Sequence, residues 1–279
     1  MSDKICFLIL AHDRFDQLNR LVQALQHPGF DLYIHVDASS GPAHIDPQLA
    51  VTVPPIAVNW AGFTQVAAIM KLMRTAVADD TAYRYYVLIS GTDYPIASND
   101  QIYRAYSQAT AQYMHCFSNP DAFWHNRYRK FHFMDMHPLP RRLIHMVGFR
   151  TQGWLFPNRK LPLPLTVHFG HTWWSFTSDA MQYIIKYLEE NPAYTQFFRY
   201  SHAADEMFFQ TILANSPFGN QIEANLNYTD WSAGGSHPKI LGEEDLDKLK
   251  ESPCLFARKF AMSENPKVLD RIDKELRGQ

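Results

Sequence analysis

The chain has few cysteines and lacks the residue patterns that commonly hold cofactors. Its 279 residues include three cysteines, Cys6, Cys116 and Cys254, which are far apart and form no CxxC pair. This usage predicts neither a disulfide framework nor a zinc knuckle, and it favours a reducing compartment. GxGxxG, GxxxxGK[ST] and HExxH are all missing, which removes the dinucleotide fingerprint, the phosphate loop and one zinc pattern. A nucleotide, if one is bound, is therefore held in some other way.

Long hydrophobic runs and an excess of one charge are missing too. The first apolar run, in "MSDKICFLILAHDRF", covers about seven residues, whereas a membrane helix needs roughly 20. The formal net charge of −2 argues against nucleic-acid binding, which requires a basic field. We expect a cytoplasmic chain without a nucleic-acid partner.

The sequence is rich in apolar residues that alternate between two patterns. With 46% hydrophobic and 19% charged residues, residues 1–279 can form one domain with a large core. "KICFLILAH", "DLYIHVD" and "YRYYVLIS" predict strands, and "DRFDQLNRLVQALQH" and "GFTQVAAIMKLMRTAVADD" predict helices between them. Continuous apolar strands alternating with helices indicate an α/β fold with a mostly parallel sheet covered on both faces. Asp13 is the expected cap of the first helix.

The second half is less regular. "TVHFGHTWWSFT" predicts a strand, and "SDAMQYIIKYLEEN" predicts a helix capped by Ser178 or Asp179. "ADEMFFQTILANS" predicts a helix that opens with two acids. The region from about 115 to 170 mixes proline, aromatic and basic residues, so it is a functional excursion or a substrate-facing subdomain. Its basic and aromatic residues would also suit an anionic acceptor or a membrane surface, including the inner face of a cell membrane.

Candidate site residues follow the predicted strands, where open α/β sheets bind ligands. Asp37 ends the second strand, and Asp93 lies in "SGTDYP" after "YVLIS" with no second acid two places on. Each can equally be a turn-forming residue. Arg258 and Lys259 in "CLFARKF" could neutralise a diphosphate leaving group, or they could simply charge an edge strand.

Two further candidates are open to structural readings as well. Glu206 could be a general base or only a partner of a helix dipole. Trp173 and Trp174 are adjacent, so in a strand they point to opposite faces and at least one belongs to the core. The other, with Trp231 in "YTDWSAGG", could stack on a sugar.

Eight stretches, in this order, resemble the core-2/I-branching β-1,6-N-acetylglucosaminyltransferases and their peptide O-xylosyltransferase relatives. They are "FLILAH", "YIHVDASS", "VNWAGFTQVAA", "YYVLISGTDYPI", "GHTWWSFTSD", "SHAADEMFFQTILANS", "DWSAGGSHPKIL" and "LFARKF". The resemblance implies a GT-A-like, Rossmann-like fold, a UDP-sugar donor and inverting transfer to a hydroxyl of a glycan, glycolipid or polysaccharide. It also implies a metal-independent reaction, with basic side chains in place of a cation, in a nucleotide-sugar half (1–110) and an acceptor and catalytic half (111–279).

The resemblance also implies roles for individual residues. Glu206 would be the catalytic base. The donor would be bound by Leu10, Asp37, Val58, Asn59, Trp60, Ser236, Lys239, Arg258 and Lys259. The acceptor or sugar would contact Asp93, Tyr94, Arg127, Thr172, Trp173 and Trp231.

One departure bears on the donor sugar. The xylosyltransferase branch has an acid where "GHTWW" has Thr172, which favours N-acetylglucosamine and leaves a xylosyltransferase as the alternative. A carbohydrate-binding protein without turnover is a second alternative, and a nucleotide-dependent oxidoreductase or methyltransferase is a third. Animal members of the family carry a membrane anchor and many disulfides. This sequence shows neither feature, so we expect a bacterial-type cytosolic member.

Overall fold

A long, mostly parallel sheet forms the centre of the fold. The computed structural model describes residues 4–118, 121–135, 157–234 and 237–278. Within them, seven strands pair in the order β3-β2-β1-β4-β7-β6-β8. Their bounds are β1 Lys4–Ala11, β2 Phe30–Val36, β3 Val51–Thr52, β4 Tyr83–Ser90, β6 Gln112–Met114, β7 Trp174–Thr177 and β8 Ile222–Glu223. The predicted α/β class and mostly parallel sheet are confirmed. The proposed division near residue 110 stays a prediction.

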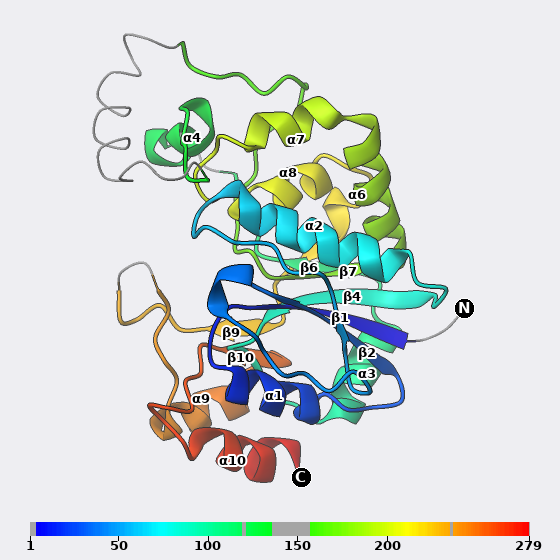
Figure 1. The fold of residues 1–279 in the computed structure, drawn as a ribbon, viewed down its shortest axis with the longest axis vertical. Coiled ribbons are helices and arrows are strands. Elements are labelled where there is room, and N and C mark those ends of the chain that lie inside the picture. Colours follow the sequence, from blue (N-terminus) through cyan, green and yellow to red (C-terminus); the bar gives the residue numbers. More distant parts are fainter. Residues whose placement is uncertain (1–3, 119–120, 136–156, 235–236, 279) are drawn as a thin grey trace.

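The central strands are apolar on both faces because helices cover both. In β1, Cys6 and Leu8 join one hydrophobic cluster, whereas Ile5, Phe7 and Ile9 join the other, as the alternation of side chains along a strand requires. Figure 1 shows α2, α6, α7 and α8 on one side of the sheet and α1, α9 and α10 on the other. The helices are α1 Phe15–Ala24, α2 Phe63–Val77, α3 Asn99–Gln108, α4 Ala122–Arg129, α6 Ser178–Glu190, α7 Pro192–Phe198, α8 Phe208–Ala214, α9 Leu246–Glu251 and α10 Val268–Ile272.

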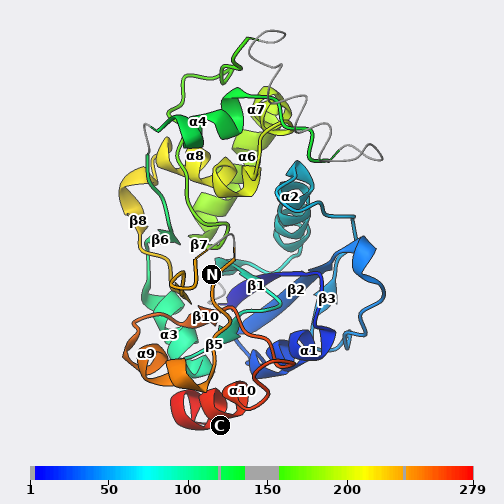
Figure 2. The ribbon, with the colours of Figure 1, turned by 90° about the vertical axis from the view of Figure 1, so that its left-hand side faces the viewer.

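Strand direction changes at β7. This strand runs antiparallel to β4, pairing Leu88 with Trp174, and also antiparallel to β6. The start of β7 therefore reaches the same edge of the sheet as the end of β4. A second, three-stranded sheet contains β5 (Tyr94–Pro95), β10 (Phe256–Arg258) and β9 (Asn227–Thr229), in that order. Figure 2 shows α4, α6, α7 and α8 at one end of the molecule and α9 and α10 at the other.

Three predicted helix starts are wrong. Asp13 does not cap α1, since the preceding residue is Arg14, in a left-handed conformation and without a side-chain cap. Thr177, rather than Ser178 or Asp179, caps α6 by accepting a hydrogen bond from the Ala180 N–H at 3.3 Å. The two acids of "ADEMFF" do not open α8, because they lie in a separate 3-10 turn, Ala204–Glu206.

The predicted strand in "TVHFGHTWWSFT" is shorter than expected and begins at Trp174. Trp173 and Trp174 are both buried. Among the helices that can be described, none has the length and apolar character needed to cross a membrane.

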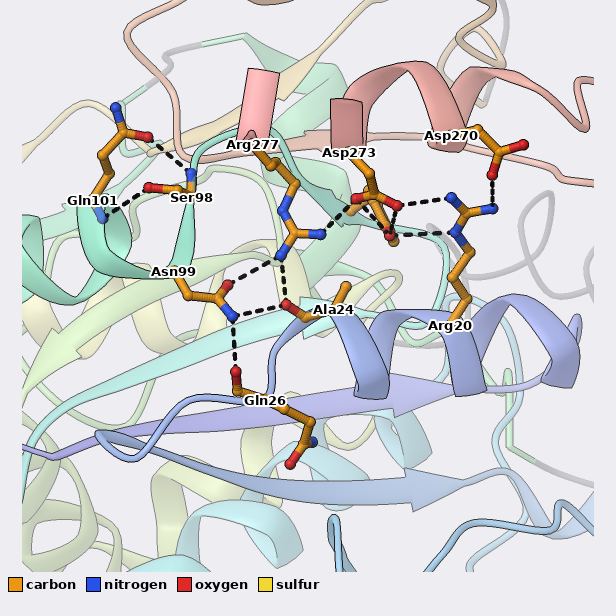
Figure 3. Close-up of polar contacts among 10 residues, drawn as sticks. Arg20, Ala24, Gln26, Ser98, Asn99, Gln101, Asp270, Asp273 and Arg277 are labelled. Carbon is orange, nitrogen blue, oxygen red and sulfur yellow. Dashed lines mark hydrogen bonds and ion pairs between the residues drawn. The ribbon is translucent and has the colours of Figure 1, made fainter. Parts of the chain in front are cut away.

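A π-helical turn, Asp273–Arg277, follows α10 and is attached to α1 and α3 by a buried polar network (Figure 3). The Arg277 guanidinium has no exposed surface and binds Asp273 at 2.6 Å and the Asn99 Oδ1 at 3.2 Å. Asp273 also pairs with Arg20 of α1 at 2.8 Å. The Tyr94 hydroxyl donates to Asp273 at 2.9 Å. Tyr94 is thereby fixed inside the fold, on the side of α1 and α10.

Candidate functional site

Side chains from distant parts of the sequence meet at one edge of the large sheet. β1, β2 and β4 are parallel, so Arg14, Asp37 and Asp93, which follow them, lie along this edge. The reversal of β7 brings Trp173 to the same edge, and β10 adds Arg258 beside Asp93. Polar side chains therefore gather beyond the strand ends, where open α/β sheets bind ligands.

Asp37 both shapes a turn and ties two loops together. Its Oδ1 accepts hydrogen bonds from the Ser39 N–H at 2.9 Å and from the Val58 N–H at 3.1 Å. Burial raises the pKa of this carboxyl, but the hydrogen bonds from Ser39 and Val58 outweigh it and lower the pKa overall. Asp37 is thus an ionised carboxylate. Its second oxygen, Oδ2, accepts no hydrogen bond from the residues that the structure describes.

The Val58 loop is joined to the Glu206 loop by backbone. Asn59 and Trp60 follow Val58, and Trp60 is 58% exposed. Ala61 and Ala203 both adopt left-handed backbone with φ of 60° and 48°, and the Ala203 N–H donates to the Ala61 carbonyl at 2.8 Å. Left-handed alanines carry a conformational cost that surrounding contacts must offset. The two loops therefore hold each other in place.

Asp93 is fully buried, and its partners are protein groups. Its Oδ2 accepts from the Ser90 N–H at 3.1 Å and from Asn227 Nδ2 at 2.8 Å. Its Oδ1 accepts from Arg258 Nε at 3.0 Å and also contacts the Ser90 hydroxyl. A side chain with 0% exposure has no surface to offer a sugar, so the expected sugar contact does not fit Asp93.

Arg258 lies between Asp93 and Trp173. Its guanidinium carbon is 4.6 Å from the centroid of the Trp173 ring, and only its Nε is hydrogen-bonded within the described chain. The two Nη nitrogens therefore remain available to a ligand. Because this guanidinium covers the Trp173 ring, Trp173 supports the cation and does not offer a free stacking face.

Lys259 adds a second cation to this edge, and Arg14 adds a third, to which the sequence assigned no role. Burial and the positive charge of Arg14 lower the pKa of Lys259, and Arg258 contributes in the same direction. Like charges gathered in one place favour an anionic ligand. The signal for Arg14 in the sequence was its position directly after the first strand. Arg14 also pairs with Asp13 at 3.4 Å and with Glu264 at 3.7 Å. Lys239 pairs with Asp245 at 2.7 Å and with Glu244 at 3.3 Å.

Glu206 forms an ion pair with Arg127. Arg127 Nη2 donates to Glu206 Oε2 at 2.7 Å and to the Ala203 carbonyl at 3.0 Å. The Glu206 side chain is 36% exposed, and its Oε1 has no hydrogen-bond partner among the residues that the structure describes. Arg127 is nearly buried and positions one carboxylate oxygen, while the other can reach a ligand.

Asp205, beside Glu206, is buried in a polar cluster. Its Oδ2 accepts from the Thr172 hydroxyl at 2.6 Å and from Gln65 Nε2 at 3.0 Å. Burial raises the pKa of Asp205 to about 6, and the charge of Glu206 adds to this rise. Thr172, expected to contact the acceptor, is itself buried and acts on Asp205. Nothing in the sequence pattern pointed to Gln65.

The other predicted residues are less central. Tyr94 is 1% exposed and faces α10, so the expected acceptor contact does not fit it. Leu10 is partly buried and packs against the hydrophobic cluster on the α2 side of the sheet. Trp231 is 43% exposed, with its ring 5.8 Å from that of His171. Ser236 lies outside the described residues. Within the described chain, no three His, Cys, Asp or Glu side chains are grouped as metal ligands would be.

Sequence comparisons with known proteins point to one family. A family model described as "Branch: Core-2/I-Branching enzyme" matches residues 5–250. Xylosyltransferase 1 of Mus musculus is 25% identical over 99% of this chain and 31% of its own length. Xylosyltransferase 2 of Canis lupus familiaris is 25% identical over 99% of this chain and 34% of its own length. The chain thus spans about a third of the length of these relatives.

One solved structure is similar at a low level. It is the apo form of the glycosyltransferase GlyE from Streptococcus pneumoniae TIGR4, with 8% sequence identity and a TM-score of 0.36 over 92% of this chain and 55% of that one.

Proposed function

Since the chain belongs to the Core-2/I-Branching enzyme family, we propose that it is an inverting glycosyltransferase that uses a UDP-sugar. The observation that carries this proposal is the arrangement at the sheet edge. Arg14, Arg258 and Lys259 form a cationic group, and Glu206 offers an accessible carboxylate oxygen. A displacement reaction with an anionic leaving group needs these two elements.

Glu206 is the proposed general base. Its Oε1 would take the proton from an acceptor hydroxyl while that oxygen attacks C1 of the donor sugar. The C1–O bond to UDP would break, and its electron pair would leave on the terminal phosphate oxygen. A single displacement from the face opposite UDP inverts the configuration at C1. Arg127 acts as a positioning residue through its 2.7 Å contact with Glu206.

Arg258 and Lys259 are proposed to stabilise the departing diphosphate, with Arg14 beside them. Asp93 orients the Arg258 guanidinium through its Nε, so the Nη nitrogens can donate to phosphate oxygens. Cationic side chains can supply the charge stabilisation that a divalent cation supplies in other sites. This supports the proposal that transfer proceeds without a metal. Asp37, Val58, Asn59 and Trp60 would hold the uridine.

The donor sugar is proposed to be N-acetylglucosamine, with xylose as the second candidate. The relatives named xylosyltransferase favour xylose. Thr172 favours N-acetylglucosamine, because the xylosyltransferase branch of the family has an acidic residue at this position and this chain has a hydroxyl. Its bond to Asp205 at 2.6 Å shows that this position serves a structural contact here.

The test is a donor screen with and without EDTA. UDP release is measured from UDP-N-acetylglucosamine, UDP-xylose, UDP-glucose and UDP-galactose, first without an acceptor and then with a glycan mixture. We expect UDP-N-acetylglucosamine to give the highest rate and EDTA to leave it unchanged. A strict requirement for Mn²⁺ would refute the metal-free mechanism, and preference for UDP-xylose would assign the other donor. No UDP release from any donor would support the carbohydrate-binding alternative.

A further inference from the structure

A cavity of about 400 Å³ lies at the same edge of the sheet, on the β6 and β8 side of Arg258. His115 follows β6, His171 precedes β7, and the segment between β8 and β9 supplies the opposite wall. Six polar residues around it are His115, His171, Glu223, Asn225, Asn227 and Thr229. Among the described residues that line the cavity, none was expected from the sequence to bind the donor or the acceptor.

The cavity shares its wall with the cationic site. Asn227 Nδ2 donates to Asp93 Oδ2 at 2.8 Å, and Asp93 holds Arg258. Asn225 Nδ2 donates to the Trp173 carbonyl at 3.0 Å. The Gly170 N–H, next to His171, donates to the Glu206 carbonyl at 2.8 Å. The cavity is therefore joined through Asn227 and Asp93 to the proposed diphosphate site, and through the backbone next to His171 to the Glu206 turn.

The two imidazoles present unused, uncharged hydrogen-bonding groups. Their ring centroids are 4.4 Å apart, and within the described chain their nitrogens have no hydrogen-bond partner. Burial lowers the pKa of His115, and it lowers the pKa of His171 to about 4, with the charges of His115 and Arg258 adding to the effect on His171. Both rings are then neutral near pH 7, and each offers one N–H donor and one acceptor.

Other groups extend the same chemistry. Asn227 Oδ1 is buried and has no partner in the described part of the protein, and buried polar atoms normally have one. Trp231, with its exposed ring 5.8 Å from His171, supplies an apolar face at the rim. Glu223 is the one acid among the six polar lining residues. Neutral donors and acceptors beside an aromatic ring match the hydroxyls and the C–H face of a sugar.

We infer that this cavity is a subsite for one uncharged pyranose residue of the acceptor, held by His115, His171 and Asn227 and covered by Trp231. The inference rests on the proposed function, which supplies the need for an acceptor beside Glu206. A neutral sugar fits better than an anionic one because Glu223 would repel a carboxylate or phosphate.

The test is direct binding of two simple glycosides. Methyl β-D-galactopyranoside and methyl N-acetyl-β-D-glucosaminide are titrated into the protein saturated with UDP, and the Kd is measured by NMR. We expect at least one glycoside to bind and His171→Ala to raise its Kd about tenfold, the value of one lost hydrogen bond of about 1.4 kcal/mol. His115→Ala, at an exposed position, should act in the same direction without a risk to folding. His44→Ala, in an exposed loop away from the cavity, is the matched control.

Two outcomes would overturn the inference. One is that neither glycoside binds. The other is that His171→Ala and His115→Ala bind the glycoside as tightly as the unmodified protein. Under the first outcome, binding of an uncharged peptide that is lost in His171→Ala would assign a peptide to the cavity instead.

UDP release without acceptor, measured on the same preparations, separates this inference from the proposed function. If UDP release persists while no glycoside binds, the subsite alone is wrong. If a glycoside binds as expected while no UDP-sugar is cleaved, the proposed transferase activity is wrong and the cavity remains a sugar site.

Discussion

The buried carboxylate of Asp93 binds Nε of Arg258 at 3.0 Å across 165 positions of sequence. The two Nη nitrogens of Arg258 form no hydrogen bond with the residues that the structure describes. A buried carboxylate that fixes a partly exposed guanidinium is a means of orienting a cation towards a ligand. We therefore expect Asp93 to act on a bound anion through Arg258.

Asp93→Asn should weaken UDP binding through Arg258. We expect the Kd for UDP to rise about tenfold, which corresponds to about 1.4 kcal/mol, because the guanidinium loses its charged partner. Arg258→Ala should weaken binding at least as much. In a double-mutant cycle measured by calorimetry, Asp93→Asn should have little further effect once Arg258 is alanine. Simple addition of the two effects would show that Asp93 acts independently.

Glu206→Gln should abolish transfer while UDP still binds. The amide cannot accept the acceptor proton, and loss of general base catalysis costs roughly 100- to 10,000-fold in rate. The measurement is kcat for transfer alongside the Kd for UDP. Glu189→Gln, on the exposed surface of α6, is the control and should keep full activity. Unchanged kcat in Glu206→Gln would remove Glu206 from the role of base.

Asp205→Asn should stabilise the protein at neutral pH. The pKa of Asp205 is raised to about 6 in the folded chain from an ordinary value of 3.8, so the folded state binds this proton more tightly than the unfolded state. Stability contributed by this group is therefore present below about pH 4 and lost as pH rises through about 6. The amide oxygen can still accept from Thr172 and Gln65.

Urea unfolding at two pH values measures this effect. Near pH 7.5 we expect Asp205→Asn to raise the free energy of unfolding by about 2 to 3 kcal/mol, and near pH 4 we expect no difference. Asp80→Asn, at an exposed position, should have little effect at either pH. A destabilised Asp205→Asn variant at neutral pH would mean that Asp205 is ionised and needed as a charge.

Asp273→Ala should destabilise the fold much more than Asp270→Ala. Both carboxylates pair with Arg20, at 2.8 Å and 2.7 Å, but Asp273 also binds the buried Arg277 and the Tyr94 hydroxyl. Removing Asp273 leaves a buried cation unpaired, which costs about 3 kcal/mol. The exposed Asp270 should contribute under about 1 kcal/mol. Equal losses for the two variants in urea unfolding would contradict the central place of Asp273 in Figure 3.

The first half of the fold was readable from sequence because its strands and helices are locally encoded. The runs that became β1, β2 and β4 are apolar throughout, which is the pattern of strands covered on both faces. Helix starts were less readable. Arg14 precedes α1 in a left-handed conformation without a side-chain cap, so no local residue preference marked that boundary.

The sequence indicated several residues of the site but not which residues contact one another. Arg258 and Lys259 could be selected as adjacent cations, and Glu206 as an acid, yet the sequence did not distinguish roles within "SGTDYP". Asp93 reaches Arg258, while its neighbour Tyr94 reaches Asp273 on the side of α10. These outcomes depend on how β5 pairs with β10 in the small sheet. Pairing between segments far apart in the chain is set by packing, which local patterns do not record.

The antiparallel pairing of β6 with β7 has a consequence for how this fold can vary. Met114 pairs directly with Trp174, so the chain between these two residues connects neighbouring antiparallel strands. The entropy of closing a flexible loop rises only slowly with its length. The segment can therefore lengthen, shorten or be exchanged without altering the order of strands. Changes in this segment that spare Arg127 and Trp173 would leave their contacts with Glu206 and Arg258 in place.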